Sequence, residues 1–167
     1  MRIVQMRVYK FVELSKKSQD RVIARFRDSN DESILESNMR ERLDELLKEN
    51  NIESIDDDRL EVYYSLSYAQ GDGAMFTGRF KWGCYYVTVT HIGNYSHCNA
   101  KNIEMVSDAG YDEHDEVVFN DIYVSIAKQL EGFGYDEIEY QNSEDVIKET
   151  IDANGYEFYD DGSIYVG

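Results

Sequence analysis

Two histidines and a cysteine, His91, His97 and Cys98, lie close together in the middle of the chain. Imidazole and thiolate groups bind zinc well, and a thiolate beside an imidazole is also a nucleophile. Structural zinc sites usually show paired ligands about two to four residues apart, and this chain has at most one such set. No third group that would orient a thiolate–imidazole pair is evident from the spacing. A metal-dependent enzyme using these three residues is therefore an alternative function, and no cofactor is expected.

The glycine-rich stretch "YSLSYAQGDGAMFTGRF", from Tyr64 to Phe80, is the second place to look for chemistry. A phosphate-binding loop needs a lysine after its glycines and then a helix. This stretch has no such lysine, and the alternating residues after Gly73 indicate a strand. We therefore predict a tight turn in which Asp72-Gly73 supplies the positive φ angles. If the loop has a function, Gln70 and Asp72 are its candidate site residues.

Acidic residues dominate the charge of the chain, which has a formal net charge of −17. Residues 1–30 hold eight Lys and Arg against three Asp and Glu, whereas residues 111–167 hold two against sixteen. A negative surface repels nucleic acid and attracts basic proteins, including those that hold nucleic acid. The simpler interpretation is that acidic faces keep a small protein in solution. The predicted acidic binding face comprises Asp112, Glu113, Asp115, Glu116, Asp136, Glu137 and Glu139.

The elements that would position these residues follow from the spacing of apolar side chains. Helical spacing and capping residues predict helices over residues 15–28, 31–50, 113–131 and 143–154. Alternation predicts strands over residues 4–8, 60–68, 75–82, 85–92 and near 103–105, followed by a C-terminal hairpin turning at Asp161-Gly162. Short connections favour an antiparallel meander of about four strands packed with about four helices, in the α+β class.

Length and composition predict one domain over residues 1–167, since the chain can bury a core and has no proline-rich linker. Two cysteines allow one disulfide at most. The N-terminal stretch lacks the apolar core of a signal peptide, and no apolar run approaches the length of a membrane span. We expect a cytoplasmic protein with reduced thiols and no membrane association.

Tyrosine is unusually common, with 14 residues. In the predicted strand before the glycines, Leu66 and Tyr68 face a core, whereas Tyr63, Ser65 and Ser67 face the other way. A face rich in Tyr and Ser can form contacts with many protein surfaces. A structural or assembly partner is therefore another alternative function. Stacking on bases would need interleaved Lys and Arg, so direct nucleic-acid binding is not expected. The tyrosines can equally pack beneath helices with their hydroxyls at the rim.

Three segments, "YSLSYAQGDGA", "VTVTHIGNYSH" and "SEDVIKETIDANGYEFYDDGSIY", resemble a group of small acidic proteins encoded by bacteriophages and prophages. The similarity covers about residues 60–167. The matching residues include Tyr64, Ser65, Leu66, Ser67, Tyr68, Gln70, Gly71, Asp72 and Gly73, then His91, Gly93, Tyr95 and His97. The resemblance implies a phage setting but no catalytic residues.

Small acidic phage proteins often bind and block a host protein, sometimes by imitating the charge of nucleic acid. Together with the acidic composition, the resemblance leads us to expect an accessory protein of the host cytoplasm. It would bind and inhibit a host protein with a basic surface, such as a nucleic-acid-handling or defence enzyme.

Overall fold

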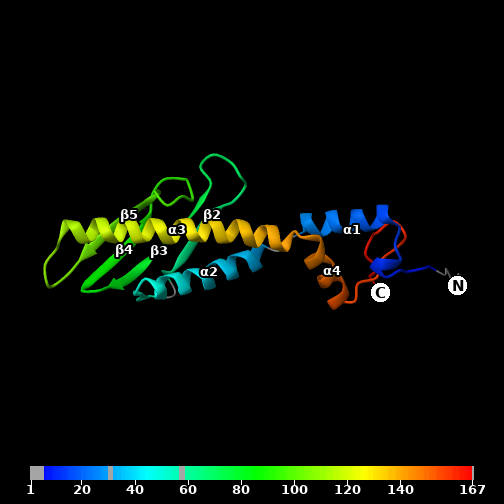
Figure 1. The fold of residues 1–167 in the computed structure, drawn as a ribbon, viewed down its shortest axis with the longest axis horizontal. Coiled ribbons are helices and arrows are strands. Elements are labelled where there is room, and N and C mark those ends of the chain that lie inside the picture. The colour runs from blue at the N-terminus through cyan, green and yellow to red at the C-terminus, as the bar shows by residue number, and fades with distance from the viewer. Residues whose placement is uncertain (1–5, 30–31, 57–58, 167) are drawn as a thin grey trace. The chain divides into compact units, whose positions relative to one another are not determined.

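The computed structural model describes residues 6–29, 32–56 and 59–166 (Figure 1). Within these residues the chain has four α-helices, a short 3-10 helix and a five-stranded antiparallel sheet, so the fold is α+β as predicted. None of the described helices is both long enough and apolar enough to cross a membrane.

The chain divides into two compact units. Unit 1 consists of residues 1–31 and 137–167, and unit 2 of residues 32–136. The long helix α3, Glu113–Gln141, contributes to both, because the division falls after Asp136. The single domain predicted over the whole chain stays a prediction.

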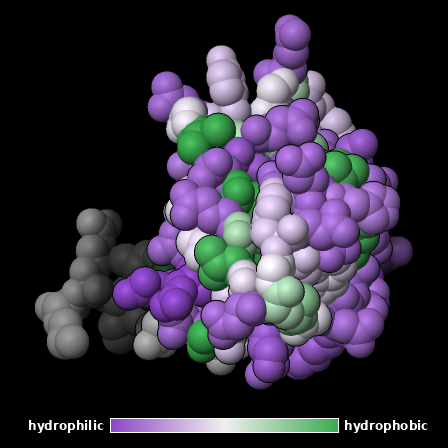
Figure 2. Space-filling model, turned by 90° about the vertical axis from the view of Figure 1, so that its left-hand side faces the viewer, coloured by the Kyte–Doolittle hydropathy of each residue, from purple (hydrophilic) through white to green (hydrophobic). Residues whose placement is uncertain are grey.

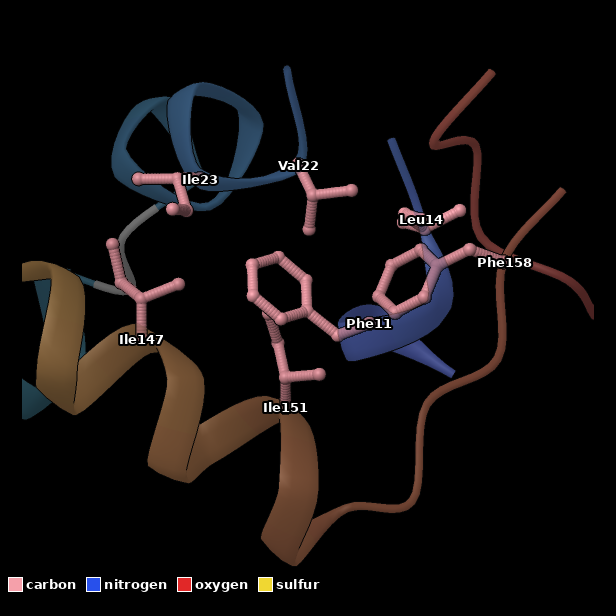
Figure 3. Packing of buried hydrophobic residues seen from close by; sticks show 7 residues of the cluster. All are labelled: Phe11, Leu14, Val22, Ile23, Ile147, Ile151 and Phe158. Carbon is pink, nitrogen blue, oxygen red and sulfur yellow. The ribbon is translucent and has the colours of Figure 1, made fainter. Parts of the chain in front are cut away.

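Unit 1 contains the 3-10 helix η1 (Phe11–Glu13), α1 (Lys16–Asp28) and α4 (Glu144–Ala153). The predicted N-caps are confirmed: Ser15 Oγ accepts from the backbone N of Ser18 (3.2 Å), and the Ser143 side chain caps α4 in the same way. The core consists of seven buried residues, shown in Figure 3: Phe11, Leu14, Val22, Ile23, Ile147, Ile151 and Phe158.

Phe158 joins the two ends of the chain within unit 1. It forms single β-bridges with Tyr9 and Ile164, and the chain turns between Phe158 and Ile164 at Gly162 (φ +84°), close to the predicted hairpin turn. Of the strand predicted at residues 4–8, positions 4 and 5 lie outside the described residues. Residues 6–8 form no strand, so that prediction is wrong for them: pairing is limited to the bridge at Tyr9.

Unit 2 is built on the sheet, whose strands are β1 (Ile52–Ser54), β2 (Glu61–Ser65), β3 (Gly73–Trp82), β4 (Tyr85–His91) and β5 (Lys101–Val106). The strand order is β1-β3-β4-β5, with β2 also paired to β3. The predicted antiparallel meander is therefore confirmed for β2, β3, β4 and β5. Alternation did not predict β1, which has only three residues. The predicted strand over 60–68 is too long, because β2 ends at Ser65.

Helices α2 (Glu32–Glu49) and α3 run alongside the sheet (Figure 1), and each buries apolar side chains. The predicted stripe of α2 is buried, with Leu35, Met39, Leu43, Leu46 and Leu47 all inside. Helix α3 runs ten residues beyond its predicted end at Glu131, and its buried residues are Phe119, Tyr123, Ile126, Ala127, Leu130 and Gly134. Val118 and Ile122 share the helical spacing of Ile126 and Leu130, which predicts that they are buried as well. They are only half-buried, because the large rings next to them occupy the core positions.

Tyr123 makes the central contact between α3 and the sheet. Its ring stacks on Phe76 with centroids 4.4 Å apart. Its hydroxyl donates to the Phe76 carbonyl (2.8 Å) and accepts from the Phe76 N–H (3.1 Å). The pairing of β3 with β4 begins at Gly78, so Phe76 has no partner residue on β4. The Tyr123 hydroxyl therefore satisfies the buried N–H and C=O of Phe76 in place of a neighbouring strand.

The substitution Tyr123→Phe keeps the ring and removes the hydroxyl. Because two buried backbone groups then lose their partner, we expect unit 2 to lose about 1–3 kcal/mol of unfolding free energy. Urea unfolding followed through Trp82, the only tryptophan, measures this loss. The matched control is Tyr86→Phe, which removes a hydroxyl from an exposed side chain of the same unit. Equal stabilities of the two variants would contradict the role assigned to the Tyr123 hydroxyl.

Candidate functional site

The connection between β2 and β3 is organised around the carboxylate of Asp72. Five groups donate to it: Ser65 Oγ (2.8 Å), Ser67 N (2.6 Å), Ser67 Oγ (3.1 Å), Ala69 N (2.8 Å) and Tyr135 Oη (3.1 Å). The hydrogen bonds from Ala69, Ser65 and Ser67, with that from Ala69 N–H the strongest influence, hold the pKa of Asp72 well below its ordinary value. Asp72 is therefore an ionised carboxylate that holds the loop, and it is unsuited to act as a general base.

The predicted turn is confirmed, but its positive φ angles lie elsewhere. Ser65 pairs with Gly73, so the glycine stretch does connect two antiparallel strands. Positive φ occurs at Tyr68 (+59°) and Gly71 (+91°), rather than at Asp72-Gly73. Tyr68 is 77% exposed and its ring lies against Tyr135 of α3, so the prediction that it faces a core is wrong.

The connection between β4 and β5 is held by its own backbone and two histidines. The Tyr95 carbonyl lies 2.9 Å from Nε2 of His91, which must therefore carry the proton there. His97 Nδ1 accepts from the Asn99 N–H (3.2 Å), which leaves the proton of a neutral His97 ring on Nε2. Lys101 Nζ donates to the Cys98 carbonyl (2.8 Å).

Two glycines let these connections approach each other. A Cβ on Gly71 would meet the Tyr95 ring at 3.4 Å, and a Cβ on Gly73 would meet the Ser96 carbonyl oxygen and the His97 ring at 3.1 Å. Between the two connections lies an open groove of about 830 Å³, lined by Gln70, Gly71, Ile92, Gly93, Tyr95, His97, Asn99 and Ala100. Its lining includes two amides, an imidazole and a phenol but no Asp, Glu, Lys or Arg, so its polar contacts suit an uncharged group.

The structure places the predicted site residues in different roles. Gln70 lines the groove, whereas Asp72 holds the loop beneath it. His97 also lines the groove, and Cys98 is buried with its Sγ 3.7 Å from His97 Nδ1. In the described parts of the chain, no group of three or more His, Cys, Asp and Glu is arranged to hold a metal ion. Both cysteines are free thiols.

The predicted acidic face is spread along α3. Asp112, Glu113, Asp115 and Glu116 lie at its beginning, whereas Asp136, Glu137 and Glu139 lie near its end. Twenty residues separate Glu116 from Asp136, which is about 30 Å along a helix. The last two acids belong to unit 1. The seven residues therefore do not form one compact surface.

Two of the acids at the start of α3 have structural partners. Asp112 Oδ1 accepts from the His114 N–H (2.8 Å) at the start of the helix. Asp115 accepts from the Tyr85 hydroxyl (2.6 Å), and this hydrogen bond raises the pKa of Tyr85 to about 12. Glu113 and Glu116 form no ion pair with any described residue. They are the two carboxylates of this cluster that remain available to a partner.

Sequence reasoning missed three residues that shape the groove. Tyr135 donates to Asp72 from α3, and Asn99 and Ile92 line the groove from the other connection. None of these three is among the matching residues of the resemblance, which do include Gln70, Gly71, Gly93, Tyr95 and His97. All five line the groove.

The substitution Asp72→Asn tests the organising role of this carboxylate. The pKa in the folded protein lies below that in the unfolded chain, so the ionised group stabilises the fold above about pH 4. The stabilisation is lost as the pH falls toward the folded value. We expect the stability difference between wild type and variant, followed through Trp82 fluorescence, to be largest near neutral pH and to shrink in acid.

Asp108→Asn is the matched control, because Asp108 is an exposed loop carboxylate of the same unit with no side-chain hydrogen bond in the described structure. Its stability should track that of the wild type at every pH. If Asp72→Asn did the same, Asp72 would not organise the loop.

Comparisons with known protein families, with curated proteins and with solved structures found no match. The resemblance to phage proteins stays a prediction, and the fold and the groove are interpreted from the residues of this chain alone.

Proposed function

We propose that this chain is an inhibitory binding protein that presents the acidic surface of unit 2 to a basic surface on a partner protein. The uneven charge of the two units carries the proposal. Unit 2 has 21 Asp and Glu against eight Lys and Arg, a net charge of −13. Unit 1 has thirteen against nine, a net charge of −4. The acidic excess therefore belongs to the unit that also contains the sheet and the groove.

Unit 1 differs because its fold brings the basic start of the chain to the acidic end. Lys10 forms an ion pair with Glu157 (3.1 Å), and Arg25 donates to the Gly162 carbonyl (3.2 Å). Hydrogen bonds from Ser163 lower the pKa of Asp161, and the nearby Arg25 contributes to the same shift. Much of the acidic tail is thus balanced internally and is less available for a partner.

The surface at the start of α3 suits an electrostatic encounter. Figure 2 faces the end of unit 2 where α3 begins and shows a mostly hydrophilic surface with separate hydrophobic spots. Glu113 is exposed and Glu116 is half-buried, and neither has a cationic partner among the described residues. Such a surface speeds association with a basic protein and repels nucleic acid, and both effects weaken with salt.

Enzymes that hold nucleic acid carry the basic grooves that this surface would fit. The resemblance to small acidic phage proteins favours such an enzyme of a host cell, for example a defence nuclease. The partner would lose activity because unit 2 occupies the groove that its nucleic acid needs.

The test captures partners from a cell lysate on the immobilised full-length protein at low and high salt. We expect basic nucleic-acid-binding proteins to bind at low salt and to be released by added duplex DNA, because both ligands would occupy one surface. If bound proteins were indifferent to duplex DNA, or if none with a basic surface were captured, the proposed function would be wrong.

Neutralisation of two carboxylates gives a quantitative check. For Glu113→Gln combined with Glu116→Gln, we expect the affinity for a captured partner at low salt to fall about threefold to tenfold, the sum of two rim interactions. The control is Glu149→Gln with Asp152→Asn, the same change of charge on exposed residues of unit 1. Equal losses in both variants would indicate general charge attraction instead of a surface on unit 2.

A further inference from the structure

The strand β5 leaves an open edge on the sheet. It is the last strand in the order β1-β3-β4-β5 and pairs with β4 alone. In the described part of the chain, no side chain is hydrogen-bonded to the backbone of residues 101–106. Half of the peptide groups of an edge strand point away from the sheet, so β5 offers donors and acceptors to another extended chain.

Two usual protections of an edge strand, a proline and a β-bulge, are missing here. The chain has no proline, and six consecutive pairs, from Tyr86–Val106 to His91–Lys101, join β4 and β5 without a bulge. The one lysine of the strand lies against a ring of α3. Lys101 Nζ lies 4.8 Å from the centroid of the Tyr123 ring and donates to the Cys98 carbonyl, so its charge is directed inward.

A groove runs beside this edge, between β5 and the start of α3. It has a volume of about 320 Å³ and is lined by Lys101, Asn102, Ile103, Glu116, Val117 and Asn120. Val117 is 58% exposed, and Val106 at the end of the strand is 64% exposed. An extended chain laid along β5 would therefore find apolar contacts as well as backbone partners.

The charged residues near the edge of β5 indicate which kind of chain could pair with it. Glu104 projects from the exposed side of β5, and Glu116 lines the groove. Lys101 also lines the groove, but its ammonium donates to the Cys98 carbonyl. A second copy of this chain would bring another unit of net charge −13 to the same place, and like charges would oppose the pairing. A segment that carries Lys or Arg would be attracted instead.

We propose that β5 binds an extended, Lys- or Arg-containing segment of a partner protein by strand addition. The partner backbone pairs with Lys101–Val106, its cations lie near Glu104 and Glu116, and its apolar side chains contact Ile103 and Val117. This inference rests on the proposed function and specifies how the partner is held. Charge brings the partner to unit 2, and backbone pairing fixes its register.

The experiment uses a short peptide of alternating Lys and Val, acetylated and amidated, and its fully N-methylated counterpart. The two peptides carry the same charge, but the second has no backbone donors. We expect the first to bind the full-length protein and to slow hydrogen exchange at the amides of β5. The N-methylated peptide should bind about tenfold more weakly or worse, the loss of roughly 1.4 kcal/mol or more in backbone pairing.

Two variants localise the contact. Glu104→Gln should weaken binding of the Lys–Val peptide, whereas Glu53→Gln, the same change on exposed β1 at another strand of the sheet, should not. Failure of the peptide to protect β5, or equal binding of both peptides, would overturn strand addition. Equal binding that still weakens with salt would leave the acidic-surface function intact. Concentration-dependent protection of β5 without peptide would indicate self-pairing and would also overturn the proposal.

Discussion

The buried hydroxyl of Tyr123 is the contact on which the arrangement of unit 2 depends. It satisfies both peptide groups of Phe76, while the ring beneath it stacks on the Phe76 side chain and anchors α3 to the sheet. Burial raises the pKa of Tyr123, so the group stays a neutral donor and acceptor. The ammonium of Lys101 also lies over the Tyr123 ring and donates to the Cys98 carbonyl. One aromatic residue thus links the helix, a strand and a wall of the groove.

Two charged side chains near the loops, Lys101 and Asp72, already have partners within the fold. Lys101 faces Tyr123 and Cys98, and desolvation lowers its pKa. Asp72 accepts hydrogen bonds from five groups, which belong to β2, the loop and α3. The groove between the loops is consequently uncharged, although it belongs to the more acidic unit. Long-range attraction of a cationic partner would therefore come from the acidic residues of unit 2. The uncharged residues that line the groove could make only short-range contacts.

The sequence predicted the elements whose signals are local. Ser15 and Ser143 cap helices because their hydroxyls reach N–H groups three residues on, and α2 buries the stripe that helical spacing marks. Long-range contacts decided the rest. The buried side of α3 is set by Phe119 and Tyr123, which meet Trp82 and Phe76 of a distant strand. The end of β2 is set by Asp72, which accepts from the N–H of Ser67, a residue that alternation assigned to a longer strand.

Charge shows most clearly why position in the sequence and position in the fold differ. The last third of the chain looks like one acidic block, yet the fold places residues after 136 with the basic start of the chain. Most of the acidic excess lies on unit 2, where the unpaired edge of β5 also lies. Charge alone steers many basic proteins with little discrimination, because it has no direction and is screened by salt. Backbone pairing does have direction and register, so strand addition at β5 would supply, in the proposed complex, the selectivity that the acidic surface lacks.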